Sequence, residues 1–218
     1  MKVLVFGATG MVGQGVLREA LHSDSVTQVS TVGRASTGMT HPKLNEVVCA
    51  NLTDLTAVRE QLMGFDACFF CLGASSVGMD ESEYTRINHD MPVSVGQQLS
   101  QWNSAMTFVY VSGAGTGSSS AMWARVKKRT EDTLLTMPFK AAFMFRPGVI
   151  QPLHGARSKT QLYYAFYVLV SPLLTTARHL FPKSVLSTEE IGLAMLKVAE
   201  FGAPKVVLES ADIRALLT

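Results

Sequence analysis

The sequence predicts a single α/β domain over residues 1–218, with a doubly wound parallel sheet of six to seven strands and helices on both faces. Short apolar runs alternate with helical patterns through the first 150 residues, which is typical of parallel strands joined by crossover helices. The apolar runs are rich in Val and Phe and alternate little with polar residues, as expected of strands covered on both faces. A chain of 218 residues is long enough to bury such a core, and no linker divides it.

The expected elements follow one another in regular order. We expect strands at 2–6, 28–32, 46–49, 67–72, 106–111, 140–145 and 205–208. We expect helices at 11–21, 54–63, 81–101, 121–137, 187–201 and 211–217. Ser187 and Glu190 have the spacing of a capping box, in which the two side chains satisfy N–H groups at a helix start.

Composition and charge exclude several classes of protein. A net charge of +2 and one short basic cluster at 125–129 argue against a nucleic-acid partner. The longest uninterrupted apolar stretch, 162–170, is far shorter than the roughly 20 residues that cross a bilayer. The apolar run that begins at Val3 stops at Gly7, which is too short for the core of an export signal. We therefore expect a cytoplasmic location.

Three cysteines leave one unpaired in any disulfide scheme, which fits a reducing compartment. Cys68 and Cys71 form a C-x-x-C pattern, which in other proteins is a redox motif. Here both fall in an expected strand, where residues three apart point to opposite faces. We expect neither a disulfide nor a redox pair, and no metal site.

A glycine-rich turn between the first strand and the first helix is the strongest functional signal. Gly7 permits a tight turn, Gly10 lets backbone N–H groups approach a pyrophosphate, and Gly13 lets the helix pack closely on the sheet. The helix start also presents unpaired N–H groups and the positive end of its dipole. The pattern indicates a Rossmann-type dinucleotide site, the alternative being a glycine-rich turn without a ligand. The expected contacts are Gly7, Thr9, Gly10, Met11, Val12 and Gly13.

The end of the second expected strand bears on which dinucleotide is bound. An acidic residue at this point would bind the ribose hydroxyls of NAD, but the sequence has Gly33 and Arg34 there. The planar guanidinium of Arg34 can meet a 2′-phosphate and stack on adenine. The alternative is a solvated arginine at a strand end. NADP(H) is favoured over NAD(H).

The same motifs, taken in chain order, resemble the short-chain dehydrogenase/reductase superfamily. The chain is similar to an atypical member, in the branch of the Tat-interacting-protein oxidoreductases, the NmrA-like proteins and the NAD(P)-binding epimerase-like proteins. The resemblance covers nearly the whole chain. It rests on residues 7–13, Gly33-Arg34, Asn51-Leu52, Cys71-Leu72-Gly73, Val111-Ser112-Gly113, Lys127 and Arg146-Pro147-Gly148.

The resemblance implies where several of these residues meet the cofactor. The position of Asn51, usually Asp in the family, would lie near adenine, and the segment that begins at Cys71 would pass beside the nicotinamide ribose. The tripeptide that begins at Arg146 would frame the nicotinamide, with backbone groups reading its carboxamide. The further cofactor contacts implied in this way are Asn51, Leu52, Cys71, Leu72, Gly73, Lys127, Arg146, Pro147 and Gly148.

The catalytic pattern of the family is Ser followed by Y-x-x-x-K. In the family the Tyr exchanges a proton with the substrate carbonyl, the Lys lowers the pKa of the Tyr and binds ribose, and the Ser hydrogen-bonds the substrate oxygen. Ser112 and Lys127 match this pattern, but Trp123 occupies the Tyr position. An indole N–H donates a hydrogen bond but does not exchange a proton near neutral pH. Other proton-exchanging side chains, which the sequence does not place in the site, are Tyr84, His89, His154, Tyr163 and Tyr164.

Two functions therefore stay open: an NADP(H)-dependent oxidoreductase acting on an apolar carbonyl or alcohol, and a non-catalytic NADP(H)-binding redox sensor or regulator. An epimerase or dehydratase of nucleotide sugars is disfavoured, because the roughly 70 residues after Gly148 are few for such a site. In the family, residues 149–218 would build the substrate side of the cleft. The segment 162–170, with basic flanks, could line an apolar pocket, form a homodimer surface or lie on a membrane surface.

Overall fold

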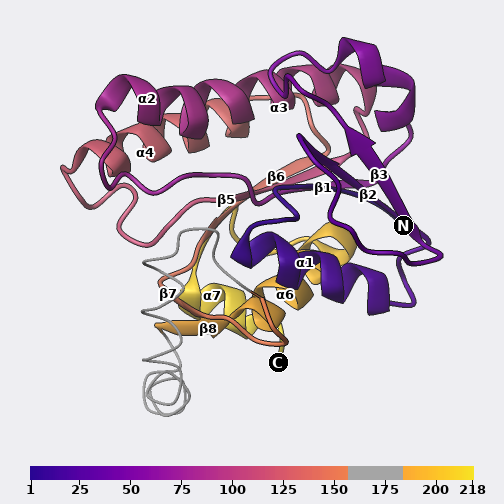
Figure 1. The fold of residues 1–218 in the computed structure, drawn as a ribbon. Coiled ribbons are helices and arrows are strands. Elements are labelled where there is room, and N and C mark those ends of the chain that lie inside the picture. The colour runs from indigo at the N-terminus through magenta and orange to yellow at the C-terminus, as the bar shows by residue number, and fades with distance from the viewer. Residues whose placement is uncertain (157–183) are drawn as a thin grey trace.

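A computed structural model describes residues 1–156 and 184–218 (Figure 1). The aromatic segment 162–170, its basic flanks, Tyr163 and Tyr164 lie outside the described residues. Within the described part, the chain forms one seven-stranded parallel sheet with helices above and below it. The predicted fold class, a doubly wound parallel α/β sheet, is confirmed.

The order of strands creates a crevice at the carboxyl ends of the central strands, where the order reverses. The chain runs outward from β1 to β2 and β3, then returns to place β4 on the other side of β1, giving the order β3-β2-β1-β4-β5-β6-β9. In such sheets, ligands bind where the order reverses, beyond the carboxyl ends of the strands. The strands are β1 (Lys2–Phe6), β2 (Gln28–Gly33), β3 (Leu44–Val48), β4 (Ala67–Phe70), β5 (Thr107–Val111), β6 (Ala141–Arg146) and β9 (Val207–Glu209).

Both faces of the sheet are covered, which explains why the strands read as continuous apolar runs. In β1, Val3 and Val5 pack into one buried cluster, while Leu4 and Phe6 pack into the other. Figure 1 shows the corresponding helix layers on opposite sides of the sheet. The first layer contains α1 (Met11–His22), α6 (Thr188–Phe201) and α7 (Ser210–Ala215); the second contains η1 (Thr56–Leu62), α2 (Glu81–Thr85), η2 (Arg86–Asp90), α3 (Met91–Trp102) and α4 (Met122–Leu135).

The structure departs from the expected elements at three places. The element expected at 54–63 is the 3-10 helix η1, and the single helix expected at 81–101 is interrupted by the π-helical turn η2. Two short parallel strands, β7 (Val149–Gln151) and β8 (Val185–Ser187), form a second sheet that the sequence did not predict. The capping box at the start of α6 is confirmed, with the Glu190 N–H donating to Ser187 Oγ at 3.0 Å and the Ser187 N–H donating to Glu190 Oε2 at 2.7 Å.

Candidate functional site

The glycine turn between β1 and α1 is shaped by close backbone contacts. Gly7 has φ of +79°, and a Cβ there would lie 2.7 Å from the backbone nitrogen of Leu72. A Cβ at Gly13 would lie 2.1 Å from the carbonyl oxygen of Gly7. Both positions therefore exclude a side chain, because the clashing atoms are backbone. The turn is closed by the Gly10 N–H, which donates to the Gly7 carbonyl at 2.9 Å.

The start of α1 is suited to an anion. Gly10 is the N-cap, no side chain accepts a hydrogen bond there, and no acidic residue stands in the first turn. The first N–H groups of the helix are thus left without a capping side chain, and nothing acidic in that turn opposes the positive end of the dipole. This arrangement fits a pyrophosphate, as the glycine pattern predicts.

A cavity of about 940 Å³ opens beside this turn, within the usual size range of ligand sites. Its wall is built from the segments that follow β1, β2, β3 and β4, together with residues of η2 and α3. The described residues that line it include two arginines, Arg34 and Arg86, and no Asp or Glu. Of the predicted contacts, the lining contains Gly7, Thr9, Gly10, Arg34, Asn51, Leu52, Cys71, Leu72 and Gly73.

Arg34 is exposed just after β2. The loop that follows it is hydrogen-bonded to the carboxylate of Glu46. Glu46 on β3 accepts hydrogen bonds from the Ser36 hydroxyl and from the backbone N–H of Thr37, the latter at 2.6 Å. These bonds, that from Ser36 first, lower the pKa of Glu46. The one acidic side chain that the loop contacts in the described structure is therefore engaged in holding the loop, and it does not line the cavity.

A second cavity, of about 610 Å³, adjoins the first. The two cavities share residues 71–74, the segment that follows β4, so together they form a continuous groove across the carboxyl ends of β1, β4 and β5. The second cavity brings together residues that the sequence analysis assigned to the cofactor and to catalysis. They are Val12, Cys71, Leu72, Gly73, Ser112, Lys127, Pro147 and Gly148.

Ser112 and Lys127 lie on different elements and meet at this cavity. Ser112 follows β5 and is buried, with its Oγ 3.3 Å from the Thr116 hydroxyl. Lys127, on α4, is half-buried; its Nζ donates to the Val111 carbonyl at 3.4 Å and stands 5.3 Å from the centroid of the Tyr110 ring. Desolvation of the ammonium lowers the pKa of Lys127 to about 8, against a smaller opposing effect of the Glu131 carboxylate.

Trp123 stands one turn before Lys127 on α4 but does not reach the groove. Its side chain is half-buried, and Cη2 would be 3.3 Å from a Cβ at Gly115, so the indole packs on the loop that precedes α4. As the described residues form them, neither cavity has Trp123 in its wall. Met11 and Gly13 also lie outside the walls, Gly13 serving the close packing on Gly7.

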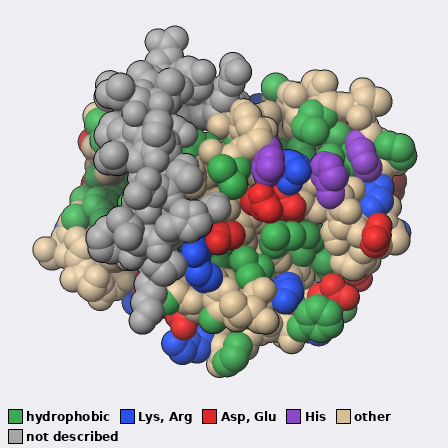
Figure 2. Space-filling view, turned by 90° about the horizontal axis from the view of Figure 1, so that it is seen from below, with side chains coloured by type: hydrophobic (Ala, Val, Ile, Leu, Met, Phe, Trp, Pro, Cys, Tyr) green, Lys and Arg blue, Asp and Glu red, His purple; other side chains and the backbone are tan. Residues whose placement is uncertain are grey.

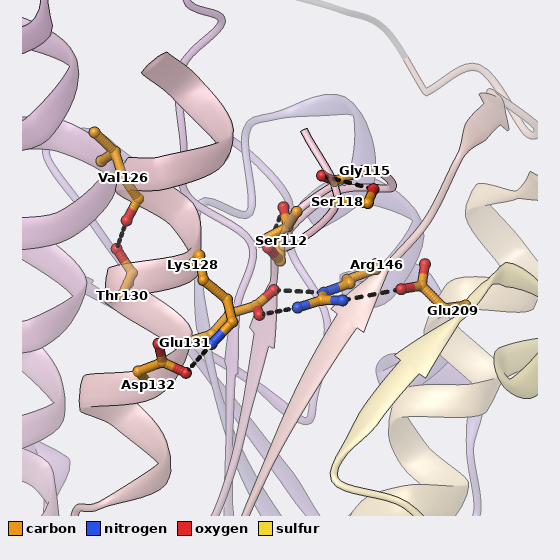
Figure 3. A network of polar contacts seen from close by, with 11 residues as sticks. Ser112, Gly115, Ser118, Val126, Lys128, Thr130, Glu131, Asp132, Arg146 and Glu209 are labelled. Carbon is orange, nitrogen blue, oxygen red and sulfur yellow. Dashed lines mark hydrogen bonds and ion pairs between the residues drawn. The ribbon is translucent and has the colours of Figure 1, made fainter. Parts of the chain in front are cut away.

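Arg146 also lies outside the described walls of both cavities. The expectation that the tripeptide beginning at Arg146 frames the nicotinamide through backbone groups stays a prediction. Figure 3 shows the Arg146 guanidinium between the carboxylates of Glu131, on α4, and Glu209, on β9. It donates to both oxygens of Glu131, at 2.9 and 2.5 Å, and to Glu209 at 3.0 Å. The next two residues do line the cavity, although the Gly148 N–H is already bonded to the Ser210 hydroxyl at 2.8 Å.

The sequence analysis missed Asn88, which supports the segment shared by both cavities. Its Oδ1 accepts from the Ala74 N–H at 3.2 Å, and the side chain is almost fully buried in η2. Its backbone carbonyl accepts from Tyr110 Oη at 3.2 Å and Thr130 Oγ1 at 2.8 Å. That carbonyl is available because Pro92, four residues on, has no N–H to donate to it. The proline was the available signal in the sequence.

The other proton-exchanging side chains weighed from the sequence are placed away from the groove, insofar as the structure describes them. Burial raises the pKa of Tyr84 to about 12. His89 is hydrogen-bonded to the Thr130 hydroxyl at 3.1 Å, and His154 pairs with Glu189 at 2.7 Å. None of these three lines either cavity.

The charges on the surface and the lengths of the helices relate to two expected absences, a nucleic-acid partner and a membrane-spanning segment. On the face drawn in Figure 2, basic and acidic side chains are interspersed over the described part of the surface. The expectation that the protein does not bind nucleic acid stays a prediction. In residues 1–156 and 184–218, no helix combines the length and the apolar character that a bilayer crossing requires.

Comparison with known proteins identifies relatives of this chain. A family described as NAD(P)H-binding matches residues 7–136. Protein FMP52, mitochondrial, of Chaetomium globosum is 28% identical over 67% of this chain and 65% of its own length, just under two thirds. Protein fmp52-2, mitochondrial, of Aspergillus terreus is 25% identical over 96% of this chain and 93% of its own. Protein HTATIP2 of Rattus norvegicus is 26% identical over 68% of this chain and 62% of its own.

These relatives correct the expected location. The two fungal proteins are named mitochondrial, so the prediction of a cytoplasmic location is wrong by this comparison. The prediction rested on the lack of an export-signal pattern, which does not distinguish between compartments inside a cell.

Solved structures agree with the fold. MoeE5 in complex with UDP-glucose and NAD superposes with a TM-score of 0.70 at 15% identity, covering 95% of this chain and 75% of that one. The Bordetella bronchiseptica enzyme WbmH in complex with NAD+ gives 0.68 at 17% identity, covering 95% and 74%. At these identities the likeness shows the fold alone. The family match and the relatives show more: the chain belongs to the NAD(P)H-binding family and is an atypical member of the short-chain dehydrogenase/reductase superfamily.

Proposed function

We propose that the protein binds NADP(H) in the groove and acts as an oxidoreductase on an apolar carbonyl or alcohol. The observation that carries the cofactor part is the first cavity, whose described lining has two arginines and no acidic residue. A 2′-phosphate beside Arg34 would meet a planar cationic fork, whereas NAD(H) gains nothing from that charge. The start of α1 would hold the pyrophosphate.

The second cavity supports the substrate class. Apart from Ser112 and Lys127, its wall is mostly apolar, with side chains such as Leu72, Val111 and Ile150. A small apolar molecule would bury its body against them, and its oxygen would be oriented by the Ser112 hydroxyl. A bound nicotinamide supplies or accepts the hydride in this family of reactions. In this proposal Lys127 also donates hydrogen bonds to the nicotinamide ribose.

One substitution tests the choice of cofactor. In Arg34→Ala, loss of a charge-assisted hydrogen bond of about 1.5–3 kcal/mol should weaken NADPH binding by roughly 10–100-fold and leave NADH binding nearly unchanged. Fluorescence titration of both nucleotides measures this. Arg125→Ala is the matched control, because Arg125 is exposed, pairs with Glu81 and does not line the cavity. Equal affinity of the wild-type protein for NADH and NADPH would refute the preference.

A second candidate function is a non-catalytic NADP(H)-binding sensor or regulator. It is favoured by Trp123, which stands where the family has its proton-exchanging Tyr and packs on the loop at Gly115. NADPH oxidation across a panel of straight-chain aldehydes, ketones and quinones separates the two functions. Turnover by the wild-type protein supports the oxidoreductase. Tight NADPH binding without turnover in the wild type, with turnover gained in Trp123→Tyr, supports the regulator.

A further inference from the structure

We propose that Lys127 is the catalytic acid of this site and delivers the proton directly to a substrate oxygen that Ser112 orients. The inference rests on the proposed oxidoreductase function and assigns the proton donor that Trp123 cannot be. In the Ser and Y-x-x-x-K pattern the lysine serves a tyrosine. Here Lys127 lines the cavity, whereas Trp123, at the tyrosine position, packs on the loop at Gly115.

The described wall of the second cavity offers few groups that exchange protons. Two of its side chains, Cys71 and Lys127, are of ionisable types. Burial raises the pKa of the Cys71 thiol far above neutrality, so it is a poor donor to a carbonyl oxygen. The Ser112 hydroxyl can orient the substrate oxygen but does not give up its proton near neutral pH. Lys127 remains as the acid.

The amine is held where the proton is needed. Its Nζ donates to the carbonyl of Val111, the residue immediately before Ser112, at 3.4 Å. The Nζ atom also lies 5.3 Å from the centroid of the Tyr110 ring. Neither the carbonyl nor the ring is basic enough to take the proton from the ammonium. An ammonium has three N–H donors, so at least one remains for the cavity.

The charged and titratable groups around Lys127 keep the proton labile. Glu131, one turn further along α4, gives both carboxylate oxygens to Arg146 and does not pair with the amine. Tyr110, on β5, is buried, which raises the pKa of its hydroxyl, and that hydroxyl bonds to a backbone carbonyl. Cys71, across the cavity, stays a neutral thiol. Desolvation, opposed by Glu131, sets the pKa of Lys127 to about 8, close to the working range of a general acid.

The step balances without another reactant. In reduction, the carbonyl carbon accepts the hydride from the dihydronicotinamide, and the π electron pair of the C=O bond moves to oxygen. The new O–H bond forms as an N–H bond of the Lys127 ammonium breaks. The products are an alcohol, an oxidised nicotinamide and a neutral amine, which regains a proton from solvent because Lys127 is only half-buried. Alcohol oxidation runs the same step backwards, with the neutral amine as base.

Lys127→Arg separates charge from proton donation. A guanidinium keeps the positive charge and the hydrogen bonds to ribose but does not release a proton at any accessible pH. We expect the Kd for NADPH to change by no more than about threefold, and kcat for the best carbonyl of the panel to fall by roughly 10²–10⁴-fold. Lys128→Arg is the matched control. Lys128 follows Lys127 on α4, pairs with Asp132 and does not line the cavity, so kcat and the Kd for NADPH should stay at the wild-type values.

The pH dependence gives a second signature. In wild type, kcat for reduction should fall as the pH rises through about 8, because the ammonium is the active form, and kcat for oxidation should rise over the same range. A readout without cofactor uses acetic anhydride labelling of the free protein with mass spectrometry. The reactivity of Lys127 should reach half its maximum near pH 8.

The outcomes distinguish the two proposals. Absence of NADPH binding in wild type overturns the proposed function itself. Binding without turnover in wild type overturns the catalytic acid and leaves the cofactor assignment standing. Turnover that survives in Lys127→Arg overturns the catalytic acid alone, as does a Lys127 labelling curve without a transition near pH 8. A loss of turnover in Tyr163→Phe or Tyr164→Phe, equal to that in Lys127→Arg, would assign the proton to a tyrosine and also overturn it.

Discussion

Arg146→Met should be among the most destabilising single substitutions in this protein. The Arg146 side chain is 12% exposed, and its partner Glu131 is 1% exposed. Methionine fills much of the same volume but leaves the Glu131 carboxylate buried without a cation. The second partner, Glu209, is 49% exposed and can be solvated by water.

The magnitude follows from that difference in burial. Breaking a buried ion pair by removing one partner costs about 3–5 kcal/mol, whereas an exposed pair contributes about 0–1 kcal/mol. We expect Arg146→Met to lose about 3–5 kcal/mol of unfolding free energy and Glu209→Gln to lose less than about 1 kcal/mol. A domain is stable by only about 5–15 kcal/mol, so the first loss is a large part of the total.

Urea unfolding, followed by circular dichroism, measures all variants of this network. The double variant Arg146→Met with Glu131→Gln should recover much of the loss, because no buried charge remains. An unfolding free energy of Arg146→Met equal to that of Glu209→Gln would refute the reasoning.

Two further predictions concern the groove. Gly13→Ala should be strongly destabilised while Gly10→Ala should fold and bind NADPH weakly, because a Cβ would lie 2.1 Å from the Gly7 carbonyl oxygen in the first case and 3.3 Å in the second. Urea unfolding and NADPH titration check both, and equal stabilities would contradict this. The hydrogen bond from Ser36 holds the pKa of Glu46 below its ordinary 4.5. The ionised Glu46 therefore stabilises the fold above that pH, and this contribution is lost as the pH falls through the lowered pKa. Glu46→Gln should therefore show a shallower loss of stability in acid, measured by urea unfolding over a pH series.

The elements that could be predicted from the sequence are those whose signal is local. The strand at 2–6 is continuous because both of its faces are buried, and its bounds match β1 (Lys2–Phe6). The helix start at Ser187 carries its own capping chemistry within four residues. The glycine turn likewise places its whole steric requirement within 7–13. In each case the physical cause lies inside a short window of sequence.

The features that the sequence did not predict depend on contacts between distant segments. The ion pairs of Arg146 were not predicted, because Glu131 and Glu209 lie 15 and 63 residues away and reach it only once α4 and β9 are packed. The strands β7 (Val149–Gln151) and β8 (Val185–Ser187) are too short to show a periodic pattern. The role of Asn88 depends on a backbone carbonyl and on a loop that folds back over it.

Asn88 leads to a last prediction, about the link between the π-helical turn and the groove. Asn88→Ala removes the acceptor of the Ala74 N–H, and with it the bond that holds the segment shared by both cavities. We expect a loss of about 1–2 kcal/mol of stability and roughly a tenfold weaker Kd for NADPH, because the loosened segment must be ordered again on binding. Unfolding and nucleotide titration measure the two effects separately.

Thr130→Val is the control that isolates the loop. It removes a buried hydroxyl that bonds to the same residue, but through the Asn88 backbone carbonyl and not through the Oδ1 that accepts from Ala74. Its shape is nearly unchanged, so it should lower stability by a similar amount while NADPH binding stays near wild type. If both variants weakened NADPH equally, the effect of Asn88 would be a general softening of η2 and α4. A selective loss in Asn88→Ala would instead mean that one buried amide oxygen sets the position of the segment against which the dinucleotide lies.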